Sequence, residues 1–374
     1  MINRIDRRRF FRVSAQRAAI AGIAGVASRM QFPAVLAAES SSIEDPSAWV
    51  TSLIKGFAAA SPLNSLRNPA NDKAWDEPLV GFSRGDDPLY ELYKEKVGPF
   101  HWTPLEIFQL TFPGTPVTAE ELTVISWILP QTELVKADLR RETKNPAERW
   151  VRARMYGEIF NEELRRVVAE SLTKNGHLAV APTLSSKFKN AKSDRYGSAS
   201  TFSERHAAYA AGLGTFGLCD GLITPKGKAM RCGSVVARIQ IAPTSRPYDD
   251  HHAYCLFYAK GICGVCITRC PGGAISKAGH DKNACVKQLA VTTRYSEKQF
   301  GITGYGCGFC QTGTPCESRI PTEISYYAQR WGGVAAGAVV AAAASYGWHY
   351  RRTRPEPGAP VPAMPARSPN EDKG

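Results

Sequence analysis

The clearest periodic pattern in the chain runs from Ala147 to Lys174. Apolar residues recur there at steps of three and four positions, which is the spacing of one face of an amphipathic helix: Val151, Met155, Ile159, Leu164, Val167, Val168 and Leu172. Asn175 and Gly176 follow and are typical of a helix end. The pattern therefore predicts one long helix packed against a core.

Shorter patterns predict the elements on either side of this helix. Residues 178–183 are expected to be a short strand, and residues 205–211 a helix that begins a second ordered unit. Residues 39–148 are rich in proline and tryptophan among turn signals, which predicts an irregular, partly helical layer. No glycine motif follows a clear strand, which argues against a Rossmann unit. The fold class expected is α+β, with residues 149–247 as the core of a layered domain.

The first 38 residues contain seven arginines and one acid. They include Arg7, Arg8 and Arg9 before two phenylalanines, then a weakly apolar stretch and small residues up to Ala38. This segment resembles a twin-arginine export signal, and a basic amphipathic helix is the alternative. We therefore expect an exported protein, periplasmic or on the outer face of the cytoplasmic membrane. Because this route moves folded proteins with their cofactors, it favours a metal or redox centre.

Residues 331–348 form an uncharged run of alanine, glycine and valine that just reaches membrane-spanning length. Arginines follow it, as expected for a cytoplasmic end. The run is a candidate transmembrane helix and suggests membrane association, while a buried helix is the alternative because alanine and glycine insert weakly. The proline-rich residues 349–374 are expected to be a disordered tail.

The net charge of +13 falls to +7 without the first 38 residues, from 40 basic and 33 acidic residues. The remaining basic residues are spread along the chain and form no dense tract. This distribution predicts a solvated surface and no nucleic-acid partner.

Eight of the ten cysteines lie in the last third of the chain: Cys255, Cys263, Cys266, Cys270, Cys285, Cys307, Cys310 and Cys316. Cysteines only two or three residues apart bond poorly to each other but converge on one metal centre, which favours ligation over disulfides. The run from Cys263 to Cys270, followed by Pro271, contains most of the bacterial ferredoxin motif. Residues 248–321 are therefore predicted to be a small ferredoxin-like module with two [4Fe–4S] clusters.

In the ferredoxin motif the cysteine before proline binds the neighbouring cluster, so the ligand sets cross. This assigns one cluster to Cys255, Cys263, Cys266 and Cys316, and the other to Cys270, Cys285, Cys307 and Cys310. Cys255 replaces the cysteine that the motif would have at Lys260, with residues 257–261 as an insertion. Two four-cysteine zinc sites are the alternative. Cys219 and Cys232 are expected to be ordinary buried thiols.

A second set of motifs precedes the cysteines: Ser203-Glu204-Arg205-His206, Ala211-Gly212-Leu213-Gly214, Leu222-Ile223-Thr224-Pro225 and Arg231. With the cysteine module, these make residues 150–320 similar to corrinoid-dependent reductases, the family of reductive dehalogenases and epoxyqueuosine reductase. The resemblance implies a nitroreductase-like domain that binds base-off cobalamin. In that family two clusters carry electrons from a low-potential donor to cobalt, which reduces a small organic substrate.

The resemblance also implies site residues. The expected cobalamin contacts are Gly212, Gly214, Gly217, Thr224 and Arg231, because closely spaced glycines permit backbone to approach a macrocycle. A surface salt bridge is the alternative for Arg231. Tyr156 matches the general position of a proton-donating tyrosine, and a packed helix residue is its alternative.

Two positions depart from the family. Residues 198–200 lack the catalytic aspartate of epoxyqueuosine reductase, and Cys219 lies where dehalogenases usually have an arginine. The function expected is an exported, reductive dehalogenase-like oxidoreductase. An exported ferredoxin-like electron carrier and a zinc-stapled binding protein are the alternatives.

Overall fold

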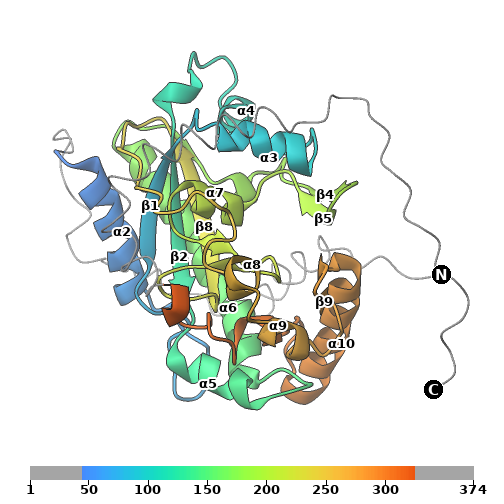
Figure 1. Cartoon of the computed structure of the whole chain (residues 1–374). Coiled ribbons are helices and arrows are strands. Elements are labelled where there is room, and N and C mark those ends of the chain that lie inside the picture. Colours follow the sequence, from blue (N-terminus) through green and yellow to red (C-terminus); the bar gives the residue numbers. More distant parts are fainter. Residues whose placement is uncertain (1–43, 325–374) are drawn as a thin grey trace, which may run out of the picture. The chain divides into compact units, whose positions relative to one another are not determined.

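A four-stranded antiparallel sheet forms the centre of the protein (Figure 1). The computed structural model describes residues 44–324. The strands lie in the order β1-β2-β8-β3 and span Leu79–Arg84, Thr123–Pro130, Met230–Ala237 and Ala179–Val180. Strands β2 and β8 pair over their full length, from Thr123 opposite Ala237 to Pro130 opposite Met230. The export signal, the candidate transmembrane helix and the tail lie outside the described residues.

Helices cover both faces of this sheet. One hydrophobic core joins it to α2 (Pro46–Ala60), α5 (Glu133–Arg141) and α6 (Glu148–Lys174). A second core joins the opposite face to α3 (Leu89–Val97), α4 (Pro104–Thr111) and α7 (Glu204–Ala210). All eight residues of β2 are buried, since both of its faces are covered. The fold is therefore α+β, as the sequence predicted.

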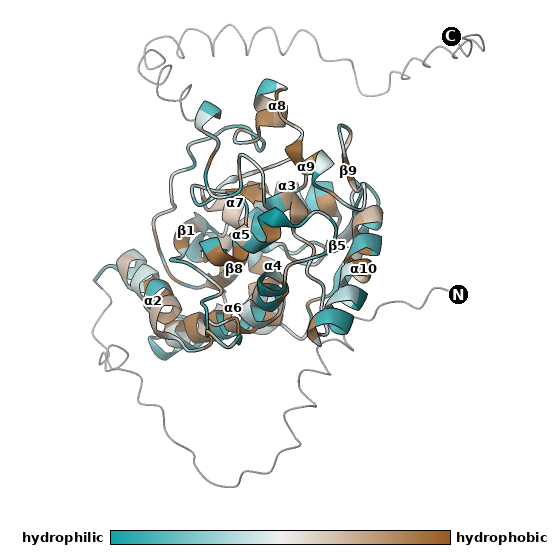
Figure 2. Ribbon diagram, turned by 90° about the horizontal axis from the view of Figure 1, so that it is seen from below, coloured by the Kyte–Doolittle hydropathy of each residue, from teal (hydrophilic) through white to brown (hydrophobic). Residues whose placement is uncertain are grey.

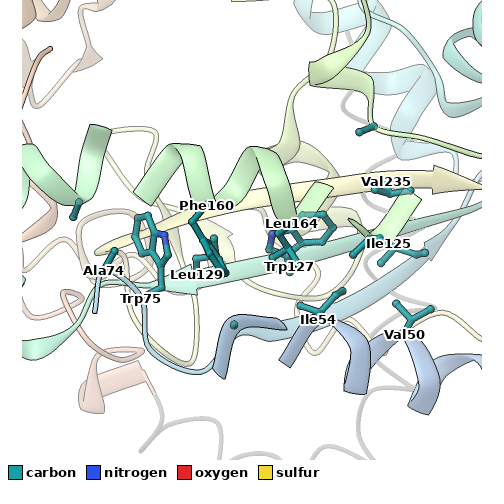
Figure 3. Close-up of a cluster of buried hydrophobic side chains, with 14 of the residues drawn as sticks. Val50, Ile54, Ala74, Trp75, Ile125, Trp127, Leu129, Phe160, Leu164 and Val235 are labelled. Atoms are coloured by element: carbon teal, nitrogen blue, oxygen red, sulfur yellow. The ribbon is translucent and has the colours of Figure 1, made fainter. Parts of the chain in front are cut away.

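The first core is built around large aromatic side chains (Figure 3). Trp75, Trp127 and Phe160 are almost completely buried, and each contributes about 2–3 kcal/mol by removal of apolar surface from water. The indole nitrogens have partners, since Trp127 Nε1 donates to Asn161 Oδ1 at 3.0 Å and Trp75 Nε1 to the Gly157 carbonyl at 3.0 Å. These bonds fix the long helix α6 on the sheet.

Residues 39–148 differ from the irregular layer that the sequence suggested. From Asp45 onward they contain α2, two strands of the main sheet and three further helices. The tryptophans at 75 and 127 are core residues. The sequence pattern did not predict strand β2. A strand that is buried on both faces is a continuous apolar run, without the alternation of polar and apolar residues that identifies a half-buried strand.

The long helix agrees with its pattern. Helix α6 ends at Lys174, and the following Gly176 has φ +84°. The predicted strand at 178–183 is reduced to the two residues of β3, whereas α7 lies within one residue of its expected bounds.

The remaining elements are short and connect the layers: η3 (Ala119–Glu121), η4 (Pro182–Leu184), the hairpin of β4 (Asn190–Ser193) and β5 (Gly197–Ser200), and the hairpin of β6 (Thr215–Phe216) and β7 (Leu222–Ile223). The cysteine-rich segment contains α8 (Leu256–Lys260), α9 (Val265–Thr268), β9 (Ile275–Ser276), β10 (Gly279–His280), α10 (Lys282–Phe300) and η5 (Phe309–Gln311). Helix α10 buries two residues, Thr292 and Ser296, and much of it is hydrophilic in Figure 2. Within the described part of the chain, no helix is both long and apolar enough to cross a membrane.

Candidate metal centre

Four cysteines line one cavity. They are Cys255, Cys263, Cys266 and Cys316, the set expected for the first cluster. Apolar side chains complete most of the wall, including Leu218, Leu256 and Phe257. All ten cysteines of the chain are free thiols. The donor set is therefore chemically suited to an iron–sulfur cluster in a largely apolar pocket.

The short helix α8 explains how Cys255 reaches this cavity. Cys255 is the N-cap of α8, and Gly261, in the left-handed conformation with φ +68°, ends the helix. The extra residues between Cys255 and Cys263 thus form one helical turn that returns the chain toward the cavity. The insertion at residues 257–261 folds into this helical turn. The thiols of Cys255 and Cys263 can therefore both reach the cavity.

A second group contains Cys270, Cys285 and Cys307. Burial, together with the nearby charges of Cys285 and Cys270, raises the pKa of Cys307 to about 12. Cys285 also contacts His280. Burial lowers the pKa of His280, but hydrogen bonds to Asp220 and Cys285 outweigh burial and raise it to about 10. Three of the four cysteines expected for the second cluster are thus near enough for two of them to shift the pKa of the third.

Cys310, the fourth expected member, lies between the two groups. The charge of Cys307 acts on it from one side, but its principal partner is the thiol of Cys219. Among residues 44–324, no three His, Cys, Asp or Glu side chains are close enough together to coordinate a single metal ion.

The segment that bears Cys307 packs directly on α6. A Cβ atom at Gly304, Gly306 or Gly308 would overlap a side chain of α6, so these glycines allow the close approach. Phe309 is completely buried in the first core. This close packing on α6 holds the segment that contains Cys307 and Cys310 in place.

Arg269 joins the cysteine-rich segment to α5. Its guanidinium donates to the carbonyls of Leu139 at 3.1 Å, Glu142 at 2.8 Å and Thr312 at 3.2 Å. Its Cζ also lies 5.4 Å from the centre of the Phe309 ring, which is a cation–π contact. Arg269 directly precedes Cys270. These contacts therefore hold Cys270, a predicted ligand, at a fixed position relative to α5.

Glu317 fixes the position of Cys316. Its carboxylate accepts hydrogen bonds from Arg140 of α5 and from the Gly313 amide. The amide of Lys228 donates to the Cys316 carbonyl at 2.8 Å. The turn before β8 and the cysteine-rich segment are thereby joined at the cavity.

Cys219 and Lys228 are site residues that the sequence patterns missed. The Cys219 thiol forms hydrogen bonds with the thiols of Cys266 and Cys310, which lower its pKa. Lys228 lines the cavity; burial lowers its pKa, but the charges of the surrounding cysteines outweigh burial and raise it. The spacing of residues in the sequence could not have identified either residue. The β6–β7 hairpin brings Cys219 to the cysteines of residues 255–316, and the turn after the hairpin brings Lys228 there.

The glycines expected to contact cobalamin have another role. Gly212 has φ +75°, and a Cβ there would overlap the carbonyl oxygen of Ser245. A Cβ at Gly214 would overlap the carbonyl oxygen of Ile223 in β7. A Cβ at Gly217 would lie 3.3 Å from the side chain of the same Ile223. The glycine spacing is thus explained by contacts within the chain, which corrects the argument for a macrocycle.

Thr224 is likewise used inside the protein. It is fully buried, and its hydroxyl donates to the Gly227 carbonyl at 2.8 Å and accepts from the Lys226 amide at 3.1 Å. These bonds close the turn that precedes β8. Thr224 and the three glycines therefore have structural roles of their own, and their contact with a corrin stays a prediction.

Arg231 belongs to a group of charges between α6, α7 and β8. Its Nε lies 3.9 Å from Glu158 Oε2, and Glu158 also pairs with Arg165 at 3.1 Å and Arg154 at 3.4 Å. Burial raises the pKa of Glu158, but these three arginines outweigh it and lower the pKa to about 2. Arg231 thus has the salt bridge that was its alternative role.

Tyr156 lies on a different face of α6. The guanidinium of Arg67 is 4.9 Å from the centre of its ring, and that of Arg152 is 5.9 Å away. The α6 side chains that reach β8 and α7 are instead Asn161 and Arg165. Tyr156 is thus a half-buried residue that stacks with arginines, and its role as a proton donor stays a prediction.

Comparisons with known proteins find similarity in structure alone. No protein-family model matches the sequence, and no curated protein matches it. A reductive dehalogenase, whose structure suggested a mechanism for B12-dependent dehalogenation, has a TM-score of 0.42 and 17% identity. That match covers 68% of this chain and 32% of the dehalogenase. The present chain thus corresponds to about a third of that enzyme.

Epoxyqueuosine reductases are also similar in structure, with lower TM-scores. The enzyme from Bacillus subtilis has a TM-score of 0.35 and 18% identity, over 67% of this chain and 64% of that one. A complex of epoxyqueuosine reductase with a modified tRNA stem loop has a TM-score of 0.35 and 19% identity, over 65% and 62%. The protein is therefore distantly similar in structure to the two kinds of enzyme that its sequence resembles.

Proposed function

We propose that this chain is an iron–sulfur oxidoreductase whose residues 248–321 hold two [4Fe–4S] clusters. The observation that carries the proposal is the cavity lined by Cys255, Cys263 and Cys266 together with Cys316, which is distant from them in the sequence. A bound cluster supplies single-electron transfer. The protein would bind it through four thiolates and limit water with the apolar wall.

The second cluster would be held by Cys270, Cys285, Cys307 and Cys310. The charges of Cys285 and Cys270 act on Cys307, and Cys307 and Cys219 both act on Cys310, which supports this grouping. The Cys270-Pro271 junction supports this crossed assignment, because zinc sites do not require it. Two clusters in neighbouring groups would allow electrons to pass from an external donor through the module.

Iron and acid-labile sulfide analysis of the anaerobically purified protein tests this proposal. We expect about eight irons and eight sulfides per chain, as two [4Fe–4S] clusters require. Substitution of Cys263 by Ser should reduce the iron content to about four. The matched control is Cys232→Ser, since Cys232 is buried in the second core and its pKa is raised by burial to about 12. Stoichiometric zinc without sulfide, or equal loss of iron in both variants, would contradict the proposal.

For the electron acceptor, the sequence resemblance suggests a corrinoid and a small organic substrate. Gly212, Gly214, Gly217 and Thr224 have contacts within the chain that explain these residue types without a ligand, so their contact with a corrin stays a prediction. Reconstitution of the cluster-loaded protein with cobalamin is the test. Stoichiometric cobalt with a base-off spectrum would support a dehalogenase-like reductase, whereas cobalt-free protein would support a ferredoxin-like electron carrier.

A further inference from the structure

Lys228 is buried next to the predicted cluster ligands. Only 3% of its surface is exposed, and its side chain lines the same cavity as the first cysteine group. Its stem also lies close to Cys219, since a Cβ at Gly221 would lie 2.8 Å from Lys228 Cδ and 3.3 Å from Cys219 Sγ. A buried ammonium is strongly unfavourable unless negative charge compensates it. The position of Lys228 therefore requires an anionic neighbour in the cavity.

The surrounding backbone holds the lysine in place. Its amide donates to the carbonyls of Cys316 at 2.8 Å and Glu317 at 3.0 Å. Its aliphatic stem fills the space beside Gly221, where a Cβ would lie 2.8 Å from Lys228 Cδ. Lys228 is thus a fixed charge with little freedom to move toward solvent.

We propose that Lys228 is the fixed positive charge that raises the reduction potential of the cluster held by Cys255, Cys263, Cys266 and Cys316. The inference rests on the proposed function. Reduction adds one negative charge to a cluster, and a nearby cation stabilises the reduced form more than the oxidised form. In a pocket shielded from water this preference is only weakly screened. Lys228 would therefore tune electron transfer without being a ligand.

Redox titration followed by electron paramagnetic resonance tests the proposal at one fixed pH. Lys228→Met removes the charge and retains most of the stem, whereas Lys228→Arg retains a positive charge. Lys226→Met is the matched control, because Lys226 is exposed and lies two positions away. We expect K228M to lower the midpoint potential of one cluster and to leave the other nearly unchanged. K228R and K226M should remain close to the wild type.

The outcomes separate charge from packing. Unchanged potentials in K228M with eight irons bound would overturn the inference. Loss of half the iron in K228M but not in K228R would overturn it in favour of a charge that is needed to retain the cluster. Equal iron loss in both variants would overturn it in favour of packing. A wild-type protein without iron and sulfide would refute the proposed function itself, so metal analysis of the wild type distinguishes the two failures.

Discussion

Gly214 lies where two backbone segments meet at the β6–β7 hairpin. Its φ is +159°, and the carbonyl oxygen of Ile223 occupies the space that a Cβ atom would need. The adjacent pair Thr215 and Ile223 is held by the hairpin, so the backbone cannot easily move away. This residue therefore has a structural reason to be glycine that is independent of any ligand.

We expect Gly214→Ala to lower the free energy of unfolding by about 2–4 kcal/mol, because overlap with backbone adds to conformational strain. Gly217→Ala is the control, since its nearest neighbour is a flexible side-chain atom at 3.3 Å and its cost should stay below about 1 kcal/mol. Urea unfolding followed by tryptophan fluorescence measures both. Equal effects of the two substitutions would show that backbone overlap is not the cause.

At the scale of elements, α6 connects the hydrophobic core to a buried group of charges. One side of the helix packs on the sheet through Phe160 and Leu164. Another side carries Glu158 and Arg165, and Arg165 also forms a double hydrogen bond with Glu204 of α7, at 2.7 and 2.6 Å. A buried pair of this kind is destabilising when one partner is removed, because the other charge is left uncompensated.

Glu158→Gln should therefore reduce stability in a pH-dependent way. The pKa of Glu158 is about 2 in the folded protein against an ordinary value of 4.5, so ionised Glu158 contributes about 3 kcal/mol above pH 4.5. This contribution is lost as the pH falls from 4.5 toward 2. The difference in unfolding free energy between wild type and E158Q should thus be largest at neutral pH and narrow in acid.

Denaturant unfolding at several pH values measures this difference. Glu163→Gln is the matched control on the same helix, because Glu163 forms an exposed pair with Arg166 at 2.7 Å. Such surface pairs contribute about 0.2–1 kcal/mol, so E163Q should show a small effect at every pH. A constant difference for E158Q across the whole range would contradict the assigned role of its charge.

For the whole molecule, we propose export by the twin-arginine route. The support is the sequence of residues 1–38, with Arg7 and Arg8 ahead of an apolar stretch. A reporter fused to residues 1–45 should be exported, and the double change of Arg7 and Arg8 to Lys should abolish this, since lysine does not reproduce the guanidinium group. Export that persists in the double variant would remove the argument. Carbonate extraction of membranes tests anchoring through residues 331–348.

Local patterns predicted several parts of the molecule well. The long helix α6 follows from apolar spacing, and α7 from its short helical run before Gly212. The cysteine spacing grouped Cys255, Cys263, Cys266 and Cys316, and the structure places all four around one cavity. These features could be predicted because helix periodicity and short ligand spacing are encoded within a few neighbouring residues.

The sequence by itself determined the α+β class, the main helix and the cysteine array. Tertiary structure alone decided which residues far apart in the chain meet at the array, above all Cys219 and Lys228. It also decided that Gly214 and Thr224 serve the protein's own turns. The physical reason is that burial, charge compensation and backbone contact depend on how distant segments pack together. The spacing of neighbouring residues in the sequence contains no information about that packing.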